Sequence, residues 1–212
     1  IKSITKALGG TQKVLTTAQW NQGSVKEPYN NYCSQIYGSE VLTGCSATAA
    51  AILMRYHKYP SQAYGPIPGY YSNGKLLEAN TPDENGYDWD NMPLTFTDSW
   101  DSVQKAQVAR LMYDCGTAFQ AQYGSDGTSA QDVNILKGMT TYMKFSKNAR
   151  LLDRADFSWD EWLVMLKNEI DSNTPVIYTG QTSSNSGHAY IIDGYDTNGY
   201  LHVNWGWGGI NN

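Results

Sequence analysis

The run from Ala47 to Met54, ATAAAILM, is apolar on nearly every side of a helix. Thr43 can cap the start of such a helix and Tyr59-Pro60 can end it, so the pattern predicts a helix from about Cys45 to Lys58. A helix without a polar face has to be buried among other elements. With 212 residues, the chain is long enough to build a core around it. The fold is therefore expected to be organised around a central, buried helix.

Further helical patterns follow along the chain. Apolar residues recur at helical spacing over residues 98–114 and 129–143, and Ser158-Trp-Asp-Glu forms a capping box ahead of a third helix. Ser129 is expected to cap the second of these helices. Residues 61–97 are rich in Pro, Gly, Asn and Tyr, and they predict irregular structure.

The end of the chain changes to strand patterns. Short apolar and β-branched runs occupy residues 176–178, 188–192 and 200–205, and Asn198-Gly199 predicts a hairpin between the last two. Helices followed by an antiparallel sheet are typical of an α+β fold with two lobes.

Composition excludes several classes of function. The chain has 15 Lys and Arg against 20 Asp and Glu, a net charge of -5 and no basic run, so neither a nucleic acid nor a membrane partner is expected. No stretch approaches the roughly 20 apolar residues that span a bilayer. Three cysteines without a C-x-x-C pair predict neither a disulfide framework nor a zinc site. No metal or cofactor is expected.

Cys45 opens the predicted central helix. Unsatisfied backbone N–H groups and the positive end of the helix dipole favour a thiolate at that position. A nucleophilic thiolate also needs a general base, normally histidine, and donors for the oxyanion that forms when it attacks a carbonyl.

His188 is the best placed of the three histidines to act as that base. His57 lies about three turns along the helix of Cys45, roughly 18 Å away, which is too far for proton transfer. His202 alternates with apolar residues inside a strand and is expected to be structural. His188 opens a strand directly after the polar loop of residues 182–187, so its ring can face a cleft.

Several segments together resemble the streptopain family of secreted bacterial cysteine peptidases, relatives of papain. They are WNQGSVKEPYN, TGCSATAAAILMRYHKYP, YDWDNM, YGSDGTSA, GHAYIIDGY and HVNWGWGG, in the order of the family, and they span about Trp20 to Gly209. The resemblance implies a papain-like fold with an active-site cleft between a helical and a β lobe. Residues 1–212 would form one peptidase domain, mostly helical over about 20–145 and mostly β over about 150–212, with further strands beyond Asn212.

The resemblance also assigns roles to individual residues. Cys45 would be the nucleophile, His188 the base, and Gln22 would bind the oxyanion together with the backbone N–H of Cys45. Ser129 and Gly187 would contact the substrate. Trp205 would lie beside the catalytic histidine, with the adjacent Asn204 as the other candidate for that position. Because neighbouring strand residues point to opposite faces, Trp205 is favoured over Asn204.

Partners and location follow from the same resemblance. The substrates would be polypeptides, selected by a hydrophobic side chain just upstream of the scissile residue. The enzyme would be made as a zymogen inhibited by its own pro-segment, and it would be secreted by a bacterium as a virulence factor.

Two other functions share parts of this sequence. A Cys-His enzyme of the transglutaminase type would pass the acyl group to an amine instead of water. Alternatively, the 16 Tyr and 7 Trp of this weakly charged chain are compatible with a non-catalytic module that binds carbohydrate or peptide.

Overall fold

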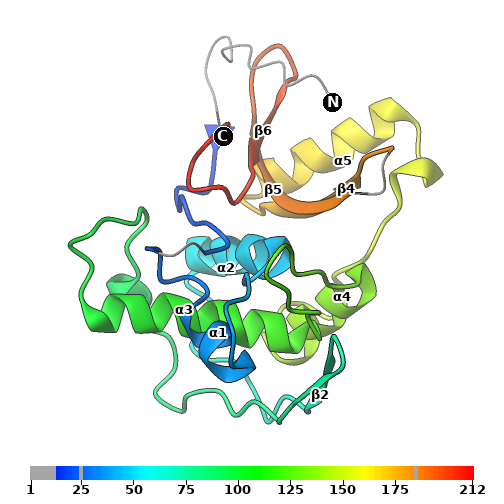
Figure 1. Cartoon of the computed structure of the whole chain (residues 1–212). Helices are drawn as coiled ribbons and strands as arrows, with labels where there is room; N and C mark the ends of the chain where they lie inside the picture. The colour runs from blue at the N-terminus through cyan, green and yellow to red at the C-terminus, as the bar shows by residue number, and fades with distance from the viewer. Residues whose placement is uncertain (1–12, 24–25, 184–185) are drawn as a thin grey trace.

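The central helix α2 (Cys45–His57) lies between the β-sheet and helix α3 (Ser102–Ala118) in the computed structural model, which describes residues 13–23, 26–183 and 186–212 (Figure 1). Residues 46–54 of α2 are all buried. The predicted helix is therefore present and occupies the core, because only other elements can cover a helix that is apolar all round.

The two ends of α2 differ in detail from the sequence prediction. Gly44, not Thr43, is the N-cap residue, and the buried Thr43 hydroxyl has no hydrogen-bond partner among the described residues. The helix ends at His57, because Lys58 adopts a left-handed conformation with φ 47°.

Within the residues that the structure describes, the helical lobe contains helices α1 (Asn31–Tyr37), α2, α3 and α4 (Asp132–Thr141), with α2 at its upper edge in Figure 1. Helix α3 starts at a capping box formed by Asp101 and Gln104 and runs beyond the predicted end at residue 114. Helix α4 starts at Asp132, three residues later than predicted. Ser129 does not cap it, because its backbone pairs with that of Gln122.

Residues 61–97 are largely irregular, as predicted, but they contain a small hairpin. Its strands are β2 (Tyr70–Ser72) and β3 (Lys75–Leu77), and a short 3-10 turn, η1, follows at Trp89–Asn91. The sequence prediction contained neither this hairpin nor α1. Both are short elements held mainly by tertiary contacts.

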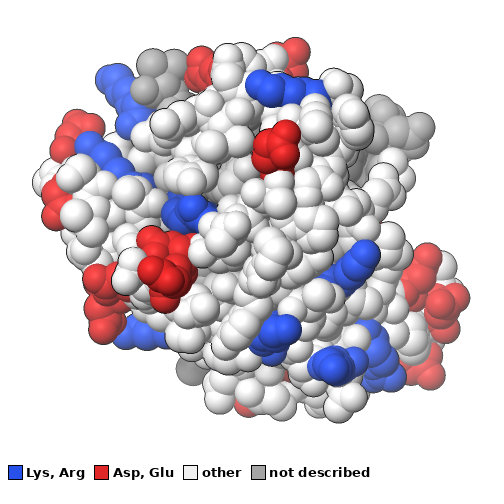
Figure 2. All heavy atoms as spheres, turned by 90° about the horizontal axis from the view of Figure 1, so that it is seen from below, with Lys and Arg blue, Asp and Glu red and all other residues white. Residues whose placement is uncertain are grey.

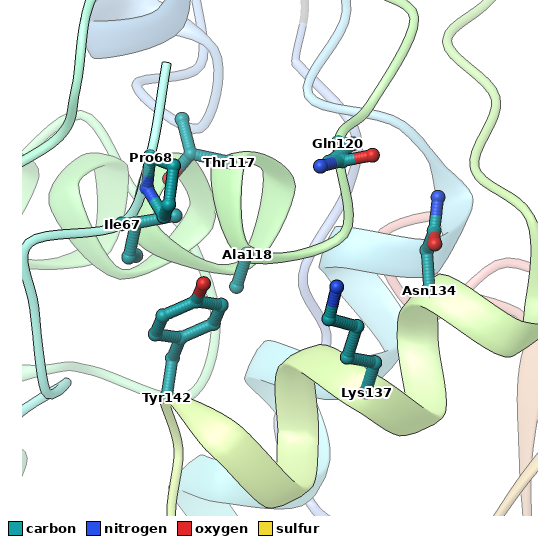
Figure 3. A pocket seen from close by; sticks show the side chains of 8 residues that line it. All are labelled: Ile67, Pro68, Thr117, Ala118, Gln120, Asn134, Lys137 and Tyr142. Atoms are coloured by element: carbon teal, nitrogen blue, oxygen red, sulfur yellow. The ribbon is translucent and has the colours of Figure 1, made fainter. Parts of the chain in front are cut away.

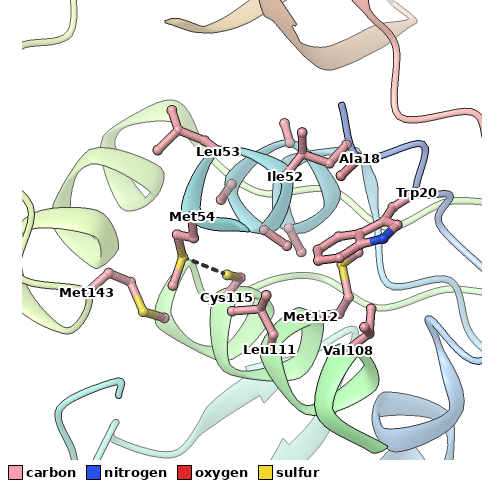
Figure 4. Packing of buried hydrophobic residues seen from close by; sticks show 14 of the residues in the cluster. Ala18, Trp20, Ile52, Leu53, Met54, Val108, Leu111, Met112, Cys115 and Met143 are labelled. Carbon is pink, nitrogen blue, oxygen red and sulfur yellow. Dashed lines mark hydrogen bonds between the residues drawn. The ribbon is translucent and has the colours of Figure 1, made fainter. Parts of the chain in front are cut away.

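Figure 4 shows how α2 and α3 pack against each other. The thiol of Cys115 lies 3.6 Å from the sulfur of Met54, with Leu111 beside Cys115, and Met112 and Trp20 pack next to each other in the same cluster. Alanines on α2 allow this close approach, because they carry no long side chain to separate the two helices.

The β lobe contains one four-stranded antiparallel sheet and helix α5 (Trp159–Asp171). Strand β5 (Gly187–Tyr195) is central and pairs with β4 (Val176–Gln181), with β6 (Leu201–Asn204) and with the short β1 (Lys13–Val14). The predicted hairpin between β5 and β6 is present. One face of the sheet packs on α5 and the other on α2.

A β-bulge in β5 carries a buried acidic residue. The register shifts between Ile192 and Gly194, and Asp193, in the bulge, lies 2.6 Å from Nδ1 of His202. The other carboxylate oxygen of Asp193 accepts hydrogen bonds from the backbone N–H and the hydroxyl of Thr16. The bulge thus attaches the N-terminal segment to the sheet, and His202 is a structural partner in a buried polar network.

Charged side chains are dispersed over the face of the helical lobe in Figure 2, where basic and acidic residues are mixed among uncharged ones. Within the described ranges, no helix is both long and apolar enough to cross a membrane.

Candidate active site

Cys45 is the first residue of α2, and its side chain is half-buried where that helix meets β5. Gly44 before it has φ +93°, and a Cβ at that position would lie 2.8 Å from the side chain of Thr128. Only glycine therefore lets the chain turn tightly into the helix with the thiol at its N-terminus.

The environment of Cys45 favours a thiolate. Burial raises the pKa of the thiol, but a hydrogen bond to His188, another from the Ala189 backbone and the charge of His188 outweigh it, so the net pKa shift is downward. A smaller lowering comes from the side chain of Ser46. The α2 N-terminus acts in the same direction.

The imidazole of His188 is held from its other side by the main chain of the loop after β6. Nε2 lies 2.9 Å from the carbonyl oxygen of Trp205. Because a carbonyl oxygen only accepts, Nε2 must carry a hydrogen, and Nδ1 is left to exchange a proton with Cys45. Burial lowers the pKa of His188, but the hydrogen bonds to Cys45 and Trp205 raise it more, so the net pKa shift is upward. Opposite shifts in the two partners stabilise a thiolate–imidazolium pair.

Trp205 and Asn204 lie on different sides of this arrangement. The Trp205 ring is 6.0 Å from the imidazole with 23° between the planes. Asn204 is buried and donates to the carbonyl of Ala18 at 3.0 Å, while its side-chain oxygen accepts from the N–H of Gly206 at 3.1 Å. The structure thus brings Trp205 to His188, whereas the hydrogen bonds of Asn204 anchor the loop that presents the Trp205 carbonyl.

The backbone of Gln22 is hydrogen-bonded to the segment that leads into α2. Its carbonyl accepts from the N–H of Thr43 at 3.0 Å, and its own N–H donates to the side chain of Asn21 at 2.7 Å. This pairing holds the backbone of Gln22 against Thr43, which is two residues before Cys45. The side chain of Gln22 is half-buried.

Ser129 and Gly187 are exposed on opposite lobes. Ser129 follows Thr128, whose hydroxyl donates to the carbonyl of Leu42 at 2.6 Å and whose side chain packs against Gly44. Gly187 directly precedes His188 at the start of β5. One residue therefore lies beside each member of the Cys45–His188 pair.

The other histidines are distant or otherwise engaged. His57 lies at the far end of α2, where it packs against Tyr56 at 4.8 Å and Phe145 at 6.2 Å, and burial lowers its pKa. His202 contacts Asp193, as described above.

Two contacts at the site were not predicted from the sequence. The Ala189 backbone reaches the thiol of Cys45, and the small Ala189 side chain in the Gly-His-Ala motif is the only sequence signal for it. Thr179 on β4 donates to the carboxylate of Asp132 on α4 at 3.1 Å and so joins the two lobes. A hydrogen bond between residues 47 positions apart leaves no local sequence pattern.

Two pockets on the molecule lie away from the pair. Figure 3 shows a pocket of about 10 Å³ between the end of α3, α4 and Ile67-Pro68, which is room for about one water molecule. A second pocket of about 130 Å³ is lined by residues that include Ile52, Arg55 and Leu94. Neither is lined by Cys45 or His188. In the described part of the chain, no three His, Cys, Asp or Glu side chains are grouped to hold a metal ion.

Several known proteins are similar to this chain in sequence and fold. The chain is 32% identical over 180 residues to streptopain from Streptococcus pyogenes, which covers 82% of this chain and 45% of streptopain. It is 29% identical over 196 residues to the thiol protease/hemagglutinin PrtT of Porphyromonas gingivalis, covering 91% of this chain and 22% of that protein. The chain thus spans less than half the length of these relatives.

Solved structures give the same result. The active wild-type interpain A cysteine protease of Prevotella intermedia superposes with a TM-score of 0.78 at 32% identity, over 93% of this chain and 83% of that one. A mutant prointerpain A fragment from the same organism gives the same TM-score over 63% of its length. These matches confirm the α+β, papain-like two-lobe fold. The sequence model of the peptidase C10 family matches residues 20–212, and the chain therefore belongs to the peptidase C10 family.

Proposed function

We propose that this chain is a cysteine endopeptidase whose nucleophile is Cys45 and whose general base is His188. The observation that carries the proposal is the placement of the two groups: Cys45 is the first residue of α2 and meets His188, whose Nε2 lies 2.9 Å from the Trp205 carbonyl oxygen. In agreement with this placement, the pKa of the thiol is lowered and that of the imidazole is raised. Such a pair supplies a thiolate and a proton donor at the same place and at the same pH.

The reaction follows from the placement of these groups. The Cys45 thiolate attacks the scissile carbonyl, and the N–H of Cys45 with the side chain of Gln22 stabilises the oxyanion. Nδ1 of His188 then protonates the leaving amine, which yields a thioester. Water, deprotonated by His188, hydrolyses the thioester and regenerates the thiolate. Trp205 keeps the imidazole oriented through its carbonyl oxygen.

The substrate would be an extended polypeptide lying between the lobes. Ser129 on one lobe and Gly187 on the other are exposed beside the reacting pair, which supports a role for both in substrate contact. A preference for a hydrophobic side chain upstream of the scissile residue is proposed from the family resemblance alone.

We also propose the finer properties that the resemblance implies. The lobes at about 20–145 and 150–212 would form one peptidase domain. The existence of a prointerpain A structure supports synthesis as a zymogen with an inhibitory pro-segment. Secretion from a bacterium and a role in virulence belong to the same set of proposals.

The first test compares the wild type with Cys45→Ala and His188→Ala on unfolded casein in reducing buffer. Hydrolysis by the wild type and its loss in both variants is expected. Product masses distinguish transfer to water from transfer to an added amine. Retained hydrolysis in Cys45→Ala would refute the assignment, and casein binding without turnover by the wild type would favour a binding module.

A further inference from the structure

His188 is bordered by three aromatic rings: Trp207 at 4.9 Å and Trp205 at 6.0 Å from the loop after β6, and Tyr190 from β5. The ring of Tyr190, two residues along β5, lies 6.1 Å from the imidazole with 24° between the planes. It also lies 4.8 Å from the ring of Trp205, whose carbonyl holds Nε2 of the imidazole. Tyr190 therefore contacts the group that fixes His188 as well as lying beside the histidine itself.

Gly180 on β4 leaves the space that Tyr190 occupies. Gly180 is the Cα partner of His188, and a Cβ at Gly180 would lie 3.4 Å from the Tyr190 hydroxyl and 3.6 Å from a carbon of its ring. The Tyr190 ring thus leans across the neighbouring strand at the level of His188. A Cβ at residue 180 would make ordinary van der Waals contact with the ring, so the ring lies directly against this position of β4.

Two further rings hold Tyr190 in place. Tyr178 is directly opposite on β4 and stacks on Tyr190 at 5.4 Å with 25° between the planes. Trp162 of α5 packs edge-on against Tyr178 at 6.0 Å. The position of the Tyr190 ring is therefore determined by packing that extends to α5, outside the cleft.

We propose that Tyr190 is a positioning residue for the reaction, whose ring maintains the orientation of the His188 imidazole and shields its hydrogen bond to the Trp205 carbonyl from water. The inference rests on the proposed function of Cys45 and His188. Tyr190 itself touches neither the thiol nor the scissile bond in this role.

The physical basis is the freedom of the imidazole. A histidine ring turns about two side-chain bonds, and one hydrogen bond at Nε2 does not fix both. Aromatic rings packed beside the imidazole restrict the remaining rotation. Rings within about 6 Å also favour the charged imidazolium. Burial, with a smaller contribution from Tyr178, raises the pKa of Tyr190 to about 12, so its ring stays neutral. Among the described residues, Cys45 is the titratable group that hydrogen-bonds to His188.

The test uses three variants of the full chain: Tyr190→Leu, Tyr190→Phe and Tyr195→Leu. Tyr195 is on the same strand, roughly 23 Å from His188 by strand rise, and it provides the same chemical change as a control. For Tyr190→Leu, kcat should fall between roughly tenfold and hundredfold with little change in KM, since misplacing a catalytic group has costs of that order. The pH range over which kcat stays high should also narrow. With the imidazolium less stabilised, the pKa of His188 should fall and that of Cys45 should rise. Tyr190→Phe keeps the aromatic ring, so its kcat and its pH profile should match those of the wild type.

Urea unfolding of all three variants separates positioning from general stability. Tyr195→Leu is expected to lose stability without narrowing the pH profile. The proposal is overturned if Tyr190→Leu keeps the wild-type kcat and profile, if Tyr190→Phe is as impaired as Tyr190→Leu, or if Tyr195→Leu has the same kinetic effect.

A second readout does not depend on peptidase activity. The rate of Cys45 alkylation by iodoacetamide across pH reports the thiolate–imidazolium pair directly. The Tyr190→Leu profile should shift to higher pH, and that of Tyr190→Phe should not. If the wild type fails to hydrolyse casein, the proposed function fails, but this comparison still decides the role of Tyr190.

Discussion

At the scale of single residues, the three cysteines of this chain have very different thiols. Burial raises the pKa of Cys33 to about 12 and that of Cys115 well above its ordinary value. Cys115 contacts Met54 in the core, and Cys33 donates to the carbonyl of Asn30 at 3.2 Å. Only Cys45 has an imidazole and a helix N-terminus beside its sulfur. Reactivity should therefore be confined to one of three chemically identical side chains.

Iodoacetamide should modify Cys45 first, with a pH–rate limb centred below pH 9.0, because the pKa of this thiol is lowered from that value. In His188→Ala the limb should move to higher pH. Burial still raises the pKa of Cys45, and the hydrogen bond to His188 that lowers it is gone. Rates measured across pH, with the labelled residue located by mass spectrometry, test this. Equal labelling of Cys33 or Cys115 in the folded protein, or an unchanged limb in His188→Ala, would contradict the expectation.

Gly206 lies between Trp205 and Trp207 in the loop that holds His188. It has φ +68°, and a Cβ there would lie 3.0 Å from the side chain of Thr48 on α2. Gly206→Ala should cost about 1–2 kcal/mol in the free energy of unfolding, for the left-handed backbone, and should also lower kcat by moving the Trp205 carbonyl. Gly74→Ala is a matched control, because Gly74 has φ +81° with open space around it. Gly74→Ala should lose stability but keep its kcat. A similar loss of kcat in both variants would refute the role of Gly206 in placing the Trp205 carbonyl.

At the scale of elements, local signals were reliable where neighbouring structure did not compete with them. Ser158 caps α5 in the predicted box, where its hydroxyl accepts from the N–H of Glu161 at 3.3 Å. Thr43 and Ser129 carry the same kind of signal but do not cap. Thr43 is buried against the segment of Gln22, and Ser129 pairs with Gln122. A capping side chain competes with backbone pairing to distant segments, and those segments cannot be seen in the local sequence.

Ser158→Ala should lower the free energy of unfolding by about 1 kcal/mol, because the N–H of Glu161 loses its acceptor and the Glu161 carboxylate loses the hydroxyl donor. Ser125→Ala, at an exposed position outside any helix, is the control and should change stability very little. Urea titrations of both variants measure the difference. Equal stability of the two variants would show that the capping box of α5 contributes nothing to the free energy of unfolding. Activity should be retained in both, because α5 covers the face of the sheet away from α2.

At the scale of the whole molecule, α2 is the element that both lobes share. It packs on α3 within the helical lobe and on β5 of the sheet, and it carries Cys45 at its N-terminus. Any shift of α2 therefore changes the core and the reacting pair together. The hydrogen bond between Thr179 and Asp132 is a second, more peripheral connection between the lobes.

Ala50→Leu tests this coupling, since Ala50 is fully buried in the middle of α2. The added side chain should destabilise the fold by about 1–3 kcal/mol, and it should lower kcat because α2 must move relative to His188. Ala106→Leu on the exposed side of α3 should change neither. Unfolding and kinetics measured together provide the check; a destabilised Ala50→Leu with wild-type kcat would mean that the site is independent of the position of α2.

The sequence by itself determined the central helix, the order of helices and strands, the α+β class and the resemblance to the streptopain family, and the fold and family matches confirm these predictions. The predictions of elements depend on short local patterns, such as an all-apolar run, a capping box or Asn-Gly between strands, and the family resemblance depends on six short segments in order along the chain. Tertiary structure decided which polar groups meet. Cys45 and His188 are 143 positions apart, and only the packing of α2 on β5 brings them together. That the Trp205 carbonyl holds Nε2, that Asn204 anchors the loop and that Tyr190 borders the imidazole all depend on strand register and on the bulge at Asp193. Contacts of this kind are made by backbone atoms and ring faces, which almost any sequence possesses, so only the folded chain specifies them.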